Sequence, residues 1–169
     1  MKHIDERILA LRHKNTSPIG TKVKEKSEQF FEGLIEMVLP DIFLDMKEEM
    51  IQKTFFADVS PTYVKTTGNG ELTMSLDLLE NNEPLETVLE QSRQLIKVLY
   101  PGSVIYENDT INELTGWFDC KIFMGKEIYY KLYFIVDKNE KKVFGSFQCR
   151  FENYDRWKLQ MINILNQIS

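Results

Sequence analysis

The stretch ELTGWFDCKIFMGKEIYYKLYFIVDKNEKKVFGSFQCRF, residues 113–151, decides the fold. It consists of three apolar and aromatic runs separated by two short polar segments. β-branched and aromatic residues favour strands, whereas glycine and polar residues favour turns. Such short connections join antiparallel neighbours only. The stretch therefore predicts a three-stranded meander with these strands and turns: Glu113–Met124, Gly125-Lys126, Glu127–Asp137, Lys138–Lys141 and Lys142–Phe151.

The two turns also predict the register of the meander. Counting back from them places Cys120 opposite Lys131 and Cys149 opposite Tyr130. Residues 130 and 131 point to opposite faces of the sheet, because side chains alternate along a strand. We therefore expect two buried, free thiols and no disulfide, which suits a reducing cytoplasm.

The same register divides the meander into two faces. One face is apolar and predicts the main core, covered by a C-terminal helix: Ile128, Tyr130, Leu132, Phe134, Val136 and Phe147. The other mixes aromatic and long polar side chains, which is typical of a protein-binding surface and equally of a face half covered by a helix. Its residues are the candidate partner-binding set: Phe118, Ile122, Tyr129, Lys131, Tyr133, Gln148 and Arg150.

Further elements are expected on both sides of the meander. A helix over Asn82–Tyr100 begins near Pro84 and has an apolar stripe, and a second helix begins at Tyr154. The stripe comprises Leu85, Val88, Leu89, Leu95, Ile96 and Leu99. Four strands are predicted, and Gly68-Asn69-Gly70 favours a hairpin turn between two of them. The strands are Glu32–Leu39, Thr62–Thr67, Glu71–Leu79 and Val104–Asn108, and a short helical segment spans Asp45–Gln52 with Asp45 as its N-cap.

This order of elements predicts an α+β fold, an antiparallel sheet flanked by helices that are segregated from it. The chain has 169 residues, enough for one domain and an arm. Pro18 and Gly20 interrupt the periodicity of the N-terminal part. We therefore expect a basic helical arm and linker over residues 1–26 and a single domain over residues 27–169.

Charge is distributed unevenly between these two parts. Residues 1–26 carry seven basic and three acidic side chains, a net charge of +4, whereas the remaining residues have a net charge of −9. An acidic body repels phosphate, so we expect no nucleic-acid partner. Ile4, Ile8 and Leu11 form one stripe of a helix over residues 2–13. That stripe must bury on its own body or on a second copy, so a homodimer through the arm is one expectation.

The chain offers little for catalysis. The two histidines, His3 and His13, lie on the arm, and a catalytic base must be held firmly within hydrogen-bond reach of its partner. We find no glycine-rich phosphate loop, nucleophile elbow or metal-ligand spacing. We expect no enzymatic activity, no cofactor and no metal. The sequence has neither a signal-peptide core nor an apolar run of about 20 residues, so we expect no membrane insertion and a cytoplasmic location.

Six segments of the chain carry a resemblance to known proteins: Leu76–Leu79, Tyr100–Gly102, Gly116–Asp119, Ile128–Phe134, Gly145–Cys149 and Trp157–Ser169. On these segments the chain resembles a group of small bacterial proteins, which is in turn similar to the PsbP-like superfamily that includes the Ran-binding Mog nucleotide-release factor. The resemblance covers residues 31–168, and the arm lies outside it. It implies an α/β/α sandwich around an antiparallel sheet and a role in binding proteins. PsbP-type members dock on photosystem subunits, the Mog type binds a small GTPase, and relatives in bacterial secretion systems are adaptor chaperones.

Two functions follow as expectations. The first is a non-enzymatic cytoplasmic protein-interaction module, specifically an adaptor or chaperone for an exported protein. The alternative is a small-molecule carrier or sensor that uses an aromatic-lined cleft between the sheet and a helix.

Overall fold

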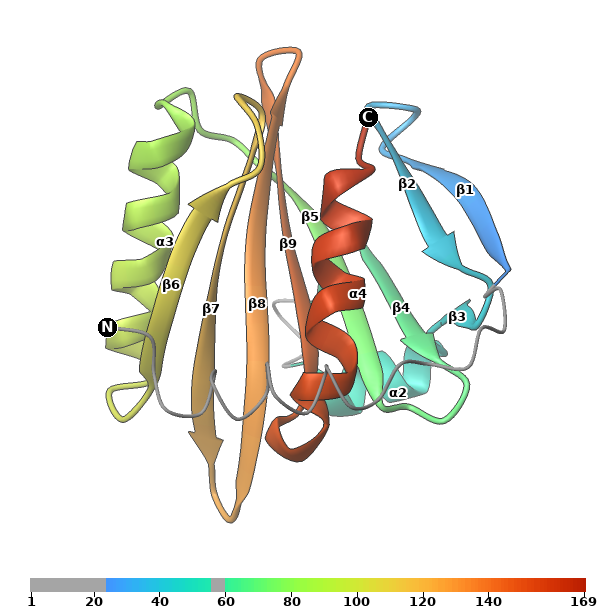
Figure 1. Ribbon diagram of the computed structural model, residues 1–169, viewed down its shortest axis with the longest axis vertical. Helices are drawn as coiled ribbons and strands as arrows, with labels where there is room; N and C mark the ends of the chain where they lie inside the picture. The colour runs from blue at the N-terminus through green and yellow to red at the C-terminus, as the bar shows by residue number, and fades with distance from the viewer. Residues whose placement is uncertain (1–23, 56–59) are drawn as a thin grey trace.

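A computed structural model of the chain describes residues 24–55 and 60–169. Its strands and α-helices, with one 3₁₀ turn at Phe151–Asn153, are β1 (Glu25–Phe30), β2 (Ile35–Pro40), β3 (Phe43–Asp45), α2 (Glu48–Thr54), β4 (Tyr63–Thr67), β5 (Leu72–Leu79), α3 (Leu85–Leu99), β6 (Val104–Thr110), β7 (Thr115–Met124), β8 (Glu127–Lys138), β9 (Lys141–Arg150) and α4 (Tyr154–Asn166). Seven strands form one antiparallel sheet in the order β3-β4-β5-β9-β8-β7-β6, and β1 pairs with β2 in a separate ribbon. Helices lie on both faces of the large sheet (Figure 1), which confirms the α+β class and the α/β/α arrangement.

The meander β7-β8-β9 has the predicted register. Cys120 pairs with Lys131, and Tyr130 pairs with Cys149. The β8–β9 turn is closed by Asn139 and Glu140, both at positive φ (52° and 59°). This is the backbone twist that two-residue hairpins favour. Both cysteines are buried and free on opposite faces of the sheet, as predicted.

The main core lies between the sheet and α4, on the side that we call the α4 face. Tyr130, Leu132, Phe134 and Phe147 alternate along β8 and β9 and are fully buried there, as the strand pattern predicts. The α4 side chains that close this core are Tyr154, Trp157, Met161, Ile164 and Leu165. Ile128 was also expected in this core, but it lies near the β7–β8 turn and is exposed.

The opposite side, which we call the α3 face, holds a smaller core under α3. Leu85, Val88, Leu89 and Ile96 are buried against it. The predicted stripe is wrong at two of its six members, because Leu95 and Leu99 are 56% and 58% exposed. Apolar spacing of three and four residues covers a wide sector of a helix, and α3 turns only part of that sector toward the sheet.

The β1–β2 ribbon contributes Phe30, Ile35, Met37 and Leu39 to the main core. It contains a strand, β1, that we did not predict from the sequence. Lys65 on β4 fixes it, because its buried ammonium contacts Glu28 of β1 and lies 2.8 Å from Asp45 of β3. Burial alone would lower the pKa of Lys65, but the two carboxylates raise it overall. At the other end, Glu36 of β2 exchanges two backbone hydrogen bonds with Ser169, of 2.8 and 3.1 Å. The ribbon is thereby held from both sides.

The segment around α2 differs from its prediction in one respect. Asp45 is not the N-cap of the helix, because it belongs to β3 and pairs with Lys65. Lys47 occupies the N-cap position and makes no side-chain capping bond. None of the seven residues of α2 is buried. This short helix thus lies on the surface of the fold.

The described residues do not include most of the predicted N-terminal arm. The predicted helix over residues 2–13 and the stripe Ile4, Ile8 and Leu11 lie outside the described residues, as do His3 and His13. Within residues 24–55 and 60–169, no helix is both long and apolar enough to cross a membrane.

Candidate functional site

The seven candidate residues lie on one face of the sheet, as the register predicts. Phe118 pairs with Tyr133, Ile122 with Tyr129, and Lys131 with Gln148, and Tyr129 also pairs with Arg150. Directly paired residues share a face. That face is the α3 face, and the helix covers only part of it.

Three of the seven residues lie beneath α3 and belong to the interior. Phe118 and Ile122 are fully buried and Tyr133 is 6% exposed, all within the smaller core. The rings of Phe118 and Tyr133 stack with their centroids 5.2 Å apart. These three side chains therefore pack in the interior and expose little or no surface to a partner. The alternative interpretation, a face half covered by the helix, is the one that holds for them.

Lys131 lies at the border between the covered and the uncovered half. Its ammonium is 5.9 Å from the ring centroids of Tyr100 and of Tyr133. Burial lowers the pKa of Lys131, because the charged form loses solvation there. Lys131 thus contributes mainly to the packing at the end of α3.

The remaining three candidates, Tyr129, Gln148 and Arg150, line an open groove of about 730 Å³. The groove lies on the uncovered half of the α3 face, between the sheet and α2. A single cross-strand row explains its position, since Leu44, Thr66, Thr73, Gln148 and Lys131 are successive partners from β3 to β8. The α3 helix covers the β8 end of this row. The β3, β4, β5 and β9 end is open and forms the floor of the groove.

The floor is made of small polar side chains. Thr66 and Thr73 lie side by side with their hydroxyl oxygens 3.5 Å apart. The amide side chain of Gln148 lies next to Thr73 in the same row. Hydroxyl and amide groups both donate and accept hydrogen bonds, so the floor can bind polar groups such as a peptide backbone.

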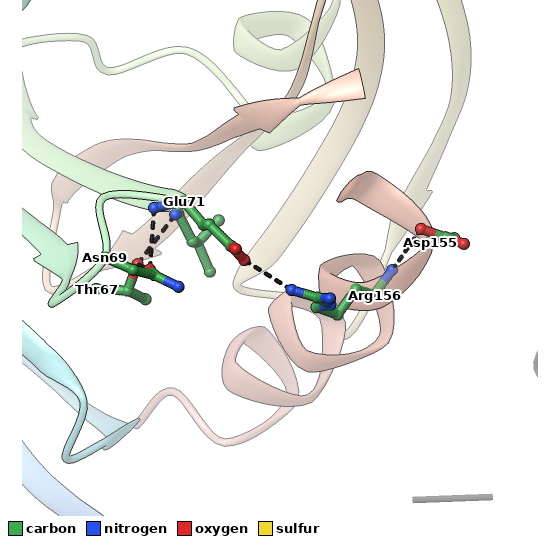
Figure 2. Close-up of polar contacts among 6 residues, drawn as sticks. Thr67, Asn69, Glu71, Asp155 and Arg156 are labelled. Carbon is green, nitrogen blue, oxygen red and sulfur yellow. Dashed lines mark hydrogen bonds and ion pairs between the residues drawn. The ribbon is translucent and has the colours of Figure 1, made fainter. Parts of the chain in front are cut away.

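The turn between β4 and β5 forms one rim of the groove (Figure 2). The Thr67 hydroxyl donates to Asn69 Oδ1 (2.7 Å), and the Glu71 amide donates to the same oxygen (3.1 Å). Gly70 has a φ of +73°, which glycine adopts at no steric cost. Figure 2 also shows Arg156 of α4 bonded to Glu71 at 2.9 Å. The rim is thus fixed by its own side chains and by the helix of the other face.

A charged cluster lies at the end of the groove where β8 begins and β9 ends. Arg150 Nη2 lies 2.9 Å from Glu127 Oε1, and the Tyr129 hydroxyl donates to the other oxygen of Glu127. That hydrogen bond raises the pKa of Tyr129, with smaller contributions from burial and from the charge of Glu127. The guanidinium of Arg150 is largely exposed and keeps donors free for a ligand.

The α2 side of the groove is apolar. Leu44 of β3 is 56% exposed and Met50 of α2 is 49% exposed. Sequence reasoning did not find this wall, nor Thr66, Thr73 and Asn69. The two threonines could have been found from the predicted Gly68–Gly70 hairpin, which places them opposite each other. No local pattern showed that α2 would pack at this edge of the sheet.

The groove is suited to binding by its composition. It combines neutral hydrogen-bonding groups on the floor, an arginine at one end and exposed apolar side chains at the other. Within the described part of the chain, no cluster of three or more His, Cys, Asp or Glu side chains could hold a metal ion. Burial raises the pKa of both Cys120 and Cys149 to about 12, so neither thiol forms a reactive thiolate near neutral pH.

An antiparallel sheet between segregated helices, with one half of a face left open, defines an α/β/α sandwich with a surface groove. More specifically, the chain has the PsbP-like and Mog-like fold. It is similar to cyanobacterial PsbP (CyanoP) from Synechocystis sp. PCC 6803, with a TM-score of 0.63 and 9% identity over 91% of this chain and 96% of that chain. It is also similar to the Ran-binding protein Mog1p from Saccharomyces cerevisiae, with a TM-score of 0.61 and 11% identity over 88% of this chain and 96% of that chain.

A third similar structure is LpqN from Mycobacterium tuberculosis, which is involved in cell envelope biogenesis. Its TM-score is 0.56 and its identity is 10%, over 88% of this chain and 91% of that chain. No protein-family model matches the sequence, and no curated protein matches it. At these identities the comparisons establish the fold alone, so the function must be argued from the groove.

Proposed function

We propose that this chain is a non-enzymatic protein-interaction module that binds a segment of a partner protein in the groove beside α2. The observation that carries the proposal is the division of the α3 face. One half is sealed by α3, whereas the other is open, preformed and lined by Tyr129, Gln148 and Arg150. Tyrosine and arginine are enriched where proteins bind one another tightly.

The chemistry of the groove indicates what kind of segment it would hold. Leu44 and Met50 can cover apolar side chains, and methionine adapts its shape to different partners. The hydroxyl and amide floor can satisfy backbone groups of an extended segment. The Ran-binding neighbour Mog1p shows that this fold can serve protein binding. As a specific role we propose an adaptor or chaperone for an exported protein, acting in the cytoplasm, where buried free thiols such as these are stable.

A pair of matched variants tests the proposal. Gln148→Arg places a long charged side chain on the floor, and Gln160→Arg makes the same change at a half-exposed position of α4 on the other face. We expect a protein captured from host lysate by the wild type to be retained by Gln160→Arg and lost by Gln148→Arg, as quantified by mass spectrometry. Equal capture by all three proteins, at equal thermal stability, would refute the groove as the binding site.

A small-molecule carrier or sensor is the second candidate, favoured by the size of the groove. Its volume of about 730 Å³ lies in the range of about 300–1,000 Å³ that is usual for ligand sites. The groove lacks the expected set of aromatic side chains. Among the described residues Tyr129 is the one aromatic side chain that lines it, because Phe118 and Tyr133 lie under α3. Native mass spectrometry of the protein purified from its host tests this function, which predicts a bound mass that Gln148→Arg abolishes.

A further inference from the structure

The segment Asp41–Thr54 forms an apolar surface that the described part of the chain leaves uncovered. We call it the α2 surface. Ile42, Leu44 and Met50 are each more than 40% exposed on it. The helix α2 itself has seven residues and no buried side chain. Helices this short are marginal in water unless another element packs on them. The α2 surface therefore requires a partner that covers it.

The α2 surface is also acidic, which limits the choice of partner. Its exposed charged residues are four carboxylates and two lysines, a net charge of −2: Asp41, Asp45, Lys47, Glu48, Glu49 and Lys53. The charge of Asp45 is balanced by its ion pair with Lys65. By contrast, Asp41, Glu48 and Glu49 contact no basic side chain of the described residues. A segment that fits here combines apolar and basic side chains, because apolar contact and charge complementarity then act together.

Such a segment precedes the described chain in the sequence. Its residues 2–13 contain three basic and two acidic side chains, a net charge of +1, and Ile4, Ile8 and Leu11 recur at the spacing of one helix face. The described chain starts at Lys24, whose carbonyl oxygen accepts a 2.9 Å hydrogen bond from the amide of Asp41. The described chain therefore begins at the edge of the α2 surface. Residues 14–23 can span up to about 33 Å, which is ample reach for a docked segment.

We propose that residues 2–13 of the same chain bind the α2 surface as a helix, with Ile4, Ile8 and Leu11 against Ile42, Leu44 and Met50. The basic side chains of the segment then face Asp41, Glu48 and Glu49. Binding within one chain is favoured over exchange between copies, because a short tether gives a millimolar effective concentration. This inference goes beyond the proposed function and stands without it. Where both hold, residues 2–13 and the partner share Leu44 and Met50.

Paired cysteine variants of the full chain test the inference. Ile8→Cys with Met50→Cys places one thiol on the segment and one on the α2 surface. The control combines Ile8→Cys with Leu159→Cys, a position that is 57% exposed on α4 and lies on the opposite face of the sheet. Oxidised glutathione serves as the oxidant and is reduced as the two thiols join. The native Cys120 and Cys149 are 0% and 2% exposed and do not compete.

The expected result is an intrachain disulfide that forms at least about tenfold faster in the Met50 pair than in the Leu159 pair. Adding Glu48→Lys and Glu49→Lys should slow the Met50 pair toward the control rate. The pair Leu11→Cys with Leu44→Cys should behave as the Met50 pair does, and it leaves Ile8 intact. Equal rates in test and control pairs would overturn the inference. Disulfide-linked dimers in place of intrachain bonds would overturn it as well, because they assign the α2 surface to a second copy.

Discussion

At the scale of single residues, Gly145 is the described glycine at which an added Cβ atom would have the least space. A Cβ atom there would lie 2.1 Å from Cζ of Phe134, the direct cross-strand partner of Gly145. Phe134 is fully buried, so its ring has no space to move into. A glycine in a strand often marks such a close approach. The ring of Phe134 can thus pack on the α4 face because residue 145 has no side chain.

Gly145→Ala is therefore expected to lower the free energy of unfolding by about 1–3 kcal/mol, the usual cost of overpacking. Urea denaturation measures it. Gly68→Ala is the matched control, because a Cβ at Gly68 meets nothing within 4 Å. We expect that control to stay within about 0.5 kcal/mol of the wild type. A Gly145→Ala protein as stable as Gly68→Ala would show that the ring does not lie over Gly145.

At the scale of the elements, α3 illustrates how one amphipathic helix divides its apolar residues. Leu89 is 2% exposed against the sheet, whereas Leu95 is 56% exposed to solvent. Leu89→Ala should cost about 2–4 kcal/mol, because it leaves a cavity above β7. Leu95→Ala should change the free energy of unfolding by no more than about 0.5 kcal/mol. Thermal or chemical denaturation distinguishes the two, and equal losses would mean that another element covers Leu95.

The elements also show what a sequence can predict. The meander could be placed residue by residue, because two short turns fix the pairing of Cys120 with Lys131 and of Tyr130 with Cys149. Alternation then assigned every candidate residue to its face. It could not show where α3 ends across that face, because the docking position of a helix depends on tertiary packing. For this reason the sequence did not reveal that three of the seven candidates lie buried under α3.

The missed elements share a physical reason as well. β1 has five polar or charged residues in its six and one buried side chain, Phe30, so its pattern is that of a polar loop. It is held by the buried ion pair between Glu28 and Lys65, which joins residues far apart in the sequence. The groove beside α2 depends on the same kind of distant contact. Neither feature could be derived from local periodicity.

At the scale of the whole molecule, buried acidic groups should make the fold sensitive to alkaline pH. Burial raises the pKa of Cys120 and Cys149 from an ordinary value of 9.0 to about 12, and it raises the pKa values of Tyr130 and Tyr133 as well. In the unfolded chain these groups ionise first, so the folded state binds more protons above pH 9. Stability then falls as the pH rises.

The free energy of unfolding should therefore decrease between pH 9 and 12, as measured by urea denaturation at fixed ionic strength. Lys65 acts in the same direction, since its raised pKa means that its stabilisation is lost at high pH, whereas the lowered pKa of Lys131 opposes the trend. Cys149→Ala should flatten the decrease. A stability that stays constant or rises over this range would contradict the burial of these groups.

Site-specific photocrosslinking in the native host tests most directly whether the open half of the α3 face binds a partner protein. A photoreactive phenylalanine analogue replaces Gln148 in one protein and Gln160 in another, so that the two probes report on opposite faces of the sheet. Binding of a partner in the groove predicts one defined adduct from position 148 and none from position 160. Adducts from position 160 alone, or the same adducts from both positions, would contradict it.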